Sequence, residues 1–594
     1  MNNKINWNLS DFYNSVSDPK IEKDKKEILF LTENFNKIYK NKINSPKITS
    51  TLFLKSLLDY QNIIEKTAII EIYASLIFST DSISNISKNL YQSSSEFGTQ
   101  INANILWYQL EIINLDDKLF KKLLNDKKIK NFTHFLTTLR IMKPFTLSEN
   151  EEKIMTQKSQ TSSQAFVRLY DQTQSTEKFE LKIKDKNKTL TISEIQSIMS
   201  NNPDRKLREN ATISYSKTFS KNSNLYSFIL NTLILDKKIS DEIRGFKYPQ
   251  EATFISYEVN QKIVENMSKA ILERQKLVEK YYLLKKKLLK LSQLYEWDRY
   301  SNIYNIDEKT YSWDEAKEII LSSFKNFDEE FYQIAKMFFE KNWIDAEVKN
   351  GKRGGAFCMY ATPSKHPLVF VNFTGKLNDI TTLAHELGHA IHAYLSKNNN
   401  YLEFNPSTAT AEIASTFAES LVFEKIFNDL KEQKLKVNLL AAKIQNGFAT
   451  VFRQNDFYIF ENELHKLRRE KGELTIDEIG NLYQKTLQKS FGKGLTLSDY
   501  HENLWMPILH FYHYNFYVFT YCFGDLLALS LFNLYKIGKK DFVKNYKKAL
   551  SQGGSQDPKN ILKIIGLNIE DKDFWKNGLN LIEKEVNDLI KLIN

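Results

Sequence analysis

Apolar side chains recur every three or four positions along the first 170 residues of the chain. The pattern is clearest through Leu52–Ile77 and again through Ile101–Leu124. This spacing places apolar side chains on one face of a helix, so it predicts a succession of amphipathic helices. The N-terminal part of the chain is therefore expected to be a helical scaffold.

A short change of period interrupts the helical pattern. Residues Phe179–Ile183 alternate between apolar and polar, a polar stretch follows, and Leu190–Ile192 is apolar at both ends, so a β-hairpin is predicted near residues 179–192. Helical spacing then resumes, and Asn202-Pro203 suits the start of a helix. We therefore expect an N-terminal helical region over residues 1–200 and a second domain over residues 201–594.

The second domain contains a glycine-rich segment that precedes an apolar run. Residues Gly354, Gly355, Ala356 and Phe357 lead toward Leu368–Phe373, and together they predict two strands of a small β-sheet. Glycine at a strand edge lets another backbone approach, so this segment could pair with a peptide as an added strand. The whole chain has only 18 Gly and 10 Pro, and the predicted architecture is mainly α.

The stretch Leu504–Phe532 is apolar enough to suggest a membrane span. However, it contains His510, His513, Asn515 and Asp525, and such groups are costly inside a bilayer. A buried helix that faces an active-site cavity explains the same residues better, so we expect no membrane partner.

Composition narrows the class of protein further. The net charge of +11 comes from lysines spread along the whole chain, with no basic stripe interleaved with aromatic residues, so we expect no nucleic-acid partner. Two cysteines in 594 residues are too few for a disulfide framework, and we expect free thiols and a reducing compartment. The N-terminus shows no apolar signal segment, which favours a cytoplasmic location.

The candidate chemistry lies in the pattern His-Glu-x-x-His. Residues four apart share one face of a helix, so His385 and His389 can bind one metal ion while Glu386 points toward a water on that ion. Eight of the nine histidines fall at or after His366, which favours a site in this part of the chain.

A catalytic zinc needs a third protein ligand. The metzincin pattern is excluded because its glycine and third histidine positions hold His392 and Leu395, and the spacing of thermolysin-like enzymes would place glutamate where Thr408 and Ala409 stand. His392 is a rival ligand, although three side chains of one straight helix cannot easily surround a tetrahedral ion. The remaining candidates are glutamates: Glu403, which we interpret as solvated, and Glu412 and Glu419, which share one face of a predicted helix that Ser407 caps.

Several segments resemble oligoendopeptidase F, within the thimet-oligopeptidase-like metallopeptidases: HELGHA, AEIASTFAE, HFYHYNFYVFTYCFG, GKRGGAF and PLVFVNFTGKLNDITTLAHELGHA. The similarity extends from about residue 110 to about residue 590. It implies a zincin core enclosed by helices that form a deep substrate channel. We therefore expect the second domain, residues 201–594, to be the catalytic domain. The similarity also implies one Zn²⁺ per chain, with Glu412 as the third ligand beside His385 and His389, and Glu419 orienting a ligand histidine.

The resemblance further implies hydrolysis of internal bonds in short peptides, with Glu386 as general base. A histidine and tyrosines near the C-terminus would face the zinc and stabilise the oxyanion. His510 and Tyr517 rank first, followed by Tyr514 and Tyr521, which recur at helical spacing; Phe519 stands where relatives often have tyrosine. The alternative for each tyrosine is a place in a buried aromatic stripe.

Two other functions remain open. The first is a dipeptidyl carboxypeptidase on the same fold, and the second is a catalytically silent helical protein that binds peptides. The expected partners in every case are short peptides, and the expected state is a monomer.

Overall fold

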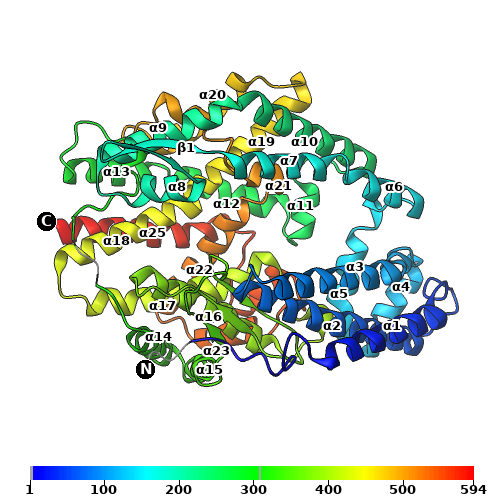
Figure 1. The fold of residues 1–594 in the computed structure, drawn as a ribbon. Helices are drawn as coiled ribbons and strands as arrows, with labels where there is room; N and C mark the ends of the chain where they lie inside the picture. The colour runs from blue at the N-terminus through cyan, green and yellow to red at the C-terminus, as the bar shows by residue number, and fades with distance from the viewer. Residues whose placement is uncertain (1–4, 307–308) are drawn as a thin grey trace. The chain divides into compact units, whose positions relative to one another are not determined.

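The computed structural model describes residues 5–306 and 309–594 and is mainly α-helical, which confirms the predicted fold class. The chain forms two compact units, each from three separate segments (Figure 1). The first unit contains Met1–Lys143, Glu308–Ile426 and Leu534–Asn568, and the second contains Pro144–Asp307, Phe427–Asn533 and Ile569–Asn594. Both units draw on residues from either side of residue 200, so the division at that residue stays a prediction.

The first unit opens with long helices α1, α2 and α3, which pack against one another. The helices predicted from apolar spacing are confirmed. Leu52–Ile77 lies within α2, and Ile101–Leu124 lies within α3 and α4. Its helices are α1 (Pro19–Tyr39), α2 (Ser50–Thr80), α3 (Asn85–Ile113), α4 (Asp117–Leu124), η1 (Lys127–Phe132), α5 (Thr133–Ile141), α14 (Trp313–Phe327), α15 (Glu329–Glu340), α16 (Leu377–Ser396), η4 (Tyr401–Glu403), most of α17 (Thr408–Asp429), α23 (Phe542–Leu550) and α24 (Pro558–Ile564).

A small sheet in the first unit packs against α16. Its strands are β3 (Ile344–Asp345), β4 (Phe357–Met359) and β5 (Leu368–Phe370), in the order β3-β5-β4, and β5 pairs parallel with β3 and antiparallel with β4. The two predicted strands are therefore confirmed. All three residues of β5 are buried, whereas β4 lies at the edge of the sheet.

The second unit holds the predicted hairpin, β1 (Phe179–Ile183) and β2 (Lys186–Leu190). Its turn residues Lys184 and Asp185 have φ of 47° and 62°, as a tight two-residue hairpin turn requires. The helices of this unit are η2 (Lys143–Phe145), α6 (Glu149–Ser159), α7 (Ser163–Thr176), α8 (Ile192–Asn201), α9 (Arg205–Lys221), α10 (Ser223–Arg244), α11 (Glu251–Ser256), α12 (Gln261–Glu273), α13 (Lys276–Leu288), η3 (Glu296–Asp298), α18 (Gln433–Gly447), η5 (Phe448–Arg453), α19 (Gln454–Lys471), α20 (Ile476–Phe491), η6 (Asp499–Asn503), α21 (His510–His513), most of α22 (Phe519–Lys536) and α25 (Phe574–Ile593).

The helix predicted to start at Asn202-Pro203 begins slightly later. Asn202 is the C-cap of α8, and the side chain of Asp204 accepts hydrogen bonds from the amides of Lys206 and Leu207 at the start of α9. An aspartate that accepts two amide hydrogen bonds is a stronger start signal than the proline.

The apolar stretch 504–532 is not one helix. It contains the short α21 and most of α22, separated by a bend in which Phe516 has a left-handed φ of 57°. The amide of Phe516 donates to the buried carboxyl of Glu461, 2.7 Å away, which holds this bend. Among residues 5–306 and 309–594, no helix combines the length and hydropathy needed to cross a bilayer.

Candidate metal centre and catalytic residues

Helix α16 carries both histidines of the sequence motif. Asp379 accepts hydrogen bonds from the amides of Thr374 (2.7 Å) and Lys376 (3.1 Å), so it anchors the first turn from inside the helix. The opposite face of α16 is buried in the core, which fixes the rotation of the helix. As a result the rings of His385 and His389 lie 5.0 Å apart on the same side.

Helix α17 approaches α16 closely at Gly388. A Cβ atom on Gly388 would lie 2.5 Å from the carbonyl oxygen of Ala414 and 2.6 Å from the Cα of Ser415, so only glycine fits. This contact brings the first turns of α17, including Glu412, beside the two histidines.

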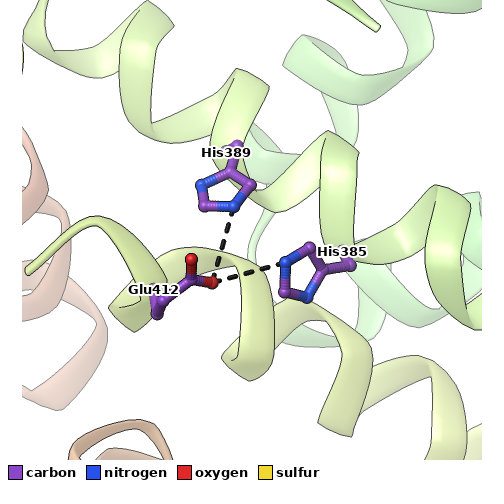
Figure 2. A group of neighbouring side chains, drawn as sticks. All are labelled: His385, His389 and Glu412. Carbon is purple, nitrogen blue, oxygen red and sulfur yellow. Dashed lines mark ion pairs between the residues drawn. The ribbon is translucent and has the colours of Figure 1, made fainter. Parts of the chain in front are cut away.

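The three side chains converge on one point (Figure 2). The Oε2 atom of Glu412 lies 3.3 Å from Nε2 of His385 and 3.5 Å from Nε2 of His389. Two ligand atoms that each lie about 2.0–2.1 Å from a tetrahedral zinc are about 3.3–3.4 Å apart, so the observed spacing fits that ion. In the part of the chain that the structure describes, these three residues are the single group of this kind.

Other side chains hold the three donors in place. Oε2 of Glu419 lies 3.4 Å from Nδ1 of His385, and the hydroxyl of Tyr360 lies 3.2 Å from Nδ1 of His389. The hydroxyl of Ser415 donates to Oε2 of Glu412 over 2.6 Å. Partners of this kind fix the orientation of metal-binding side chains.

The family resemblance indicated Glu419, whereas Tyr360, Ser415 and Gly388 were not predicted from the sequence. Ser415 could have been found, because it follows Glu412 by three positions on the predicted helix and therefore shares its face. Tyr360 follows strand β4, and no local pattern points from it to His389.

The charges of the donors suit a cation. Burial would lower the pKa of His385, but its contacts with Glu412 and Glu419 raise it to about 10. Burial lowers the pKa of His389 to about 4, whereas the two histidines hold the pKa of Glu412 at about 2 against the effect of burial. A metal ion would therefore take the place of the proton that His385 otherwise carries.

Glu386 lies on the same helix but outside the group of three donors. It is only 7% exposed, and burial raises the pKa of its carboxyl to about 7, against the opposing effect of His385. A carboxyl with a pKa near neutrality can both accept and return a proton.

The two rival ligands lie elsewhere. His392 is buried outside the group, and burial lowers its pKa to about 3. Glu403 is not solvated as expected; it is 4% exposed and accepts a hydrogen bond from the amide of Phe135 at 3.0 Å. The expectation was wrong because the residues around a loop glutamate do not indicate that a backbone amide far away in the sequence will bind it.

The predicted oxyanion residues gather around the bend in the second unit. The rings of His510 and Tyr517 are stacked 5.8 Å apart, and Tyr517 lies 5.4 Å from Tyr521 and 5.7 Å from Tyr514. Nε2 of His510 lies 3.1 Å from the hydroxyl of Tyr521. These residues therefore form a cluster, although the helical spacing that suggested it is interrupted between α21 and α22.

The predicted substrate segment lies in the first unit. Gly354 and Gly355 are exposed, with open space where a Cβ would stand, and Gly355 has a φ of +85°. Asn372 donates hydrogen bonds of 2.9 Å to the carbonyls of Arg353 and Gly355, which ties this loop to the end of β5. Among the four predicted residues, only Phe357 lies in strand β4.

The helical fold and the two motif histidines with a glutamate from a second helix define a class, the helical metallopeptidases with a His-Glu-x-x-His motif. The chain belongs to peptidase family M3, whose sequence profile matches residues 198–581. A second profile, oligopeptidase F, matches residues 111–179. The chain is therefore a peptidase, and members of this family are generally metalloendopeptidases.

Individual relatives agree with this assignment. The chain is 27% identical to oligopeptidase PepF of Bacillus subtilis, over 99% of this chain and 87% of that protein. It is also 27% identical to an oligoendopeptidase F homologue of Borreliella burgdorferi, over 100% and 99% of the two chains. The fold is similar to that of oligoendopeptidase F from Enterococcus faecium, with a TM-score of 0.73, 20% identity and 97% and 99% of the two chains covered.

Proposed function

We propose that the chain is a zinc-dependent endopeptidase that hydrolyses internal bonds of short peptides. The observation that carries the proposal is the convergence of His385, His389 and Glu412 beside the buried carboxyl of Glu386. The chemistry that zinc supplies at such a site is Lewis acidity toward the scissile carbonyl and the attacking water.

Glu386 is the general base of the proposed reaction. Its carboxylate accepts a proton from the attacking water and then delivers that proton to the departing amine. Its pKa of about 7 leaves both protonation states accessible near neutral pH. Proton transfer of this kind contributes about 10² to 10⁴-fold to the rate.

His510 and Tyr517 are proposed to donate hydrogen bonds to the oxyanion that forms at the attacked carbonyl. Tyr514 and Tyr521 pack around them and complete the cluster. One such donor is worth about 10² to 10³-fold in turnover. Glu419 is proposed to fix the ring of His385.

Strand β4 and the glycines before it are proposed to bind the substrate backbone. An edge strand presents unpaired backbone groups, so an extended peptide can add to it with little dependence on side chains. Relatives named oligoendopeptidases support short peptides as the substrates. The deep channel, the cytoplasmic location and the monomeric state are part of the same proposal.

The proposal is tested with an internally quenched peptide of about ten residues whose two ends are blocked. We expect cleavage by the wild type and loss of cleavage in Glu386→Gln, with zinc bound to both proteins in equal amounts. Glu424→Gln is the matched control, since Glu424 lies on α17 and pairs with Lys536 at 2.5 Å. Full activity in Glu386→Gln, or absence of zinc from the active wild type, would refute the mechanism.

The same peptide separates the two other functions. A dipeptidyl carboxypeptidase would cleave only a version of the peptide with a free C-terminus and would release dipeptides. A silent binding protein would bind the peptide without consuming it.

A further inference from the structure

The second unit contains a small cavity that takes no part in the proposed reaction. It lies between α13, the segment after η3, the turn η5 and α20. Arg299, Arg453 and Asp456 supply charged or titratable groups, and Phe448, Phe452 and Phe491 supply apolar walls. The space admits an occupant about the size of one or two water molecules.

Both arginines that line this cavity carry unsatisfied hydrogen-bond donors. The Nε atoms of Arg299 and Arg453 are buried and have no acceptor among the residues that the structure describes. One terminal nitrogen of Arg453 donates to the hydroxyl of Tyr300 at 2.7 Å, and the guanidinium of Arg299 lies 4.8 Å from the Tyr300 ring. A buried donor without an acceptor is costly, so an acceptor in the cavity would stabilise both arginines.

The charge of the cavity wall is positive at neutral pH. Arginine stays protonated in proteins, so two positive charges share the cavity. Burial raises the pKa of Asp456 to about 8, and its carboxyl accepts a hydrogen bond from Ser490 at 2.8 Å. Asp456 supplies at most one negative charge against two guanidinium groups, so the wall keeps a net positive charge whether or not this carboxyl is ionised.

The charges of the two arginines also act on neighbouring titratable groups. Burial and the two arginines together lower the pKa of His501 to about 3, so this ring adds no charge. Burial would raise the pKa of Tyr300, but Arg299 and Arg453 lower it. The same positive electrostatic potential would attract an anion.

The backbone at the cavity is also unusual. Turn η5 is a π-helical turn of six residues inserted between α18 and α19, and it supplies Phe448, Phe452 and Arg453 to the wall. Such turns are rare and occur frequently at functional sites, which supports a ligand at this position.

We propose that this cavity binds one small monovalent inorganic anion of halide size, with chloride as the occupant in solution. The two guanidinium groups supply the charge and the hydrogen bonds, and the phenylalanine rings favour a weakly hydrated ion over phosphate. The size of the cavity excludes larger anions.

The first test compares thermal unfolding in sodium chloride and in sodium gluconate at equal ionic strength. Gluconate is too large for the cavity, so we expect the Tm of the wild type to be higher in chloride by roughly 2 °C, with saturation as chloride increases. Arg299→Gln should lose this increment. Arg244→Gln is the control, because Arg244 pairs with Glu152 at 2.8 Å in the same unit and should retain it.

The second test does not depend on a folded variant. Crystals of the wild type grown without halide and soaked in bromide should show an anomalous peak between Arg299 and Arg453. A wild-type Tm that is equal in chloride and gluconate, or crystals without this peak, would overturn the proposal and leave water as the occupant.

Discussion

Glu419 illustrates how a residue beyond the metal donors can control the site. Its Oε2 atom lies 3.4 Å from Nδ1 of His385, so it can fix that ring and make the opposite nitrogen a better ligand. We expect Glu419→Ala to bind zinc about 10 to 100-fold more weakly and to recover part of its activity in excess zinc. Zinc affinity, measured by competition with a chromogenic chelator, checks this prediction.

Glu424→Ala is the matched control for this change, because Glu424 lies on the same helix and pairs with Lys536 instead. Its zinc affinity should equal that of the wild type. Equal affinities in Glu419→Ala and the wild type would show that the contact with His385 has no role in metal binding.

Individual site residues differed in how far the sequence could reveal them. His385 and His389 follow from a spacing that a helix turns directly into geometry. Glu412 lies on a second helix, so its role was implied only by the family resemblance. The contact between Tyr360 and His389 joins residues 29 positions apart, and it depends on how the sheet packs on α16.

Helices α16 and α17 meet at Gly388, and the metal site depends on their close approach. An added methyl group at Gly388 would collide with backbone atoms of Ala414 and Ser415, which cannot move independently of α17. We expect Gly388→Ala to destabilise the fold by about 1–3 kcal/mol and to reduce bound zinc, because α17 carries Glu412. Chemical denaturation and metal analysis measure both effects.

Gly447→Ala is the control for this substitution. Gly447 also lies in a helix, but nothing lies within 4 Å of the position of its Cβ. Alanine there should be neutral or stabilise by up to about 1 kcal/mol. A stable Gly388→Ala protein with a full complement of zinc would show that the two helices can separate without loss of the site.

The bend between α21 and α22 depends on Glu461, and this dependence predicts a pH effect. Burial raises the pKa of Glu461 to about 8, so the folded state holds a proton there that the unfolded state releases above about pH 4.5. Stability from this group is therefore lost as pH rises through that window, by at most ~1.4 kcal/mol per pH unit. Glutamine can accept the same hydrogen bond from Phe516 without titrating.

We therefore expect the free energy of unfolding to fall less between pH 5 and pH 8 in Glu461→Gln than in the wild type. Urea titrations at the two pH values measure this difference. Glu473→Gln removes an exposed carboxyl of the same unit and should behave as the wild type does. Identical pH profiles for the wild type and Glu461→Gln would mean that the carboxylate is ionised in the folded protein.

At the level of elements, periodicity predicted most of the fold. Apolar residues at helical or alternating spacing correctly predicted the N-terminal helices, the hairpin and the two strands before α16. The interruption after α21 was not predicted, because His510, Tyr514, Tyr517 and Tyr521 keep a helical spacing across it. The bend depends on a hydrogen bond from Phe516 to Glu461, 55 positions earlier, which no local pattern contains.

At the scale of the whole molecule, the two compact units do not follow the order of the chain, and the boundary near residue 200 stays a prediction. Each compact unit takes three segments, and the chain passes between the units five times. The metal donors belong to the first unit, whereas the cluster around His510 belongs to the second. Composition and periodicity report on neighbouring residues, so they cannot show which distant segments share a core.

Metal binding should stabilise the folded chain as a whole, since the three donors are brought together only by folding. With free zinc about 100-fold above its dissociation constant, binding stabilises the folded state by about 2.7 kcal/mol, so chelation should lower the Tm by a few degrees. Differential scanning calorimetry with and without a chelator measures the shift.

Two variants determine whether the shift comes from the proposed site. Glu386→Gln keeps all three donors and should show the same response to chelation as the wild type. Glu412→Ala lacks the donor that contacts both histidines, so its Tm should not change with chelation. A chelator response that survives Glu412→Ala would place the metal elsewhere in the chain. Loss of the response in Glu386→Gln would instead make Glu386 a ligand, which would exclude it as the base.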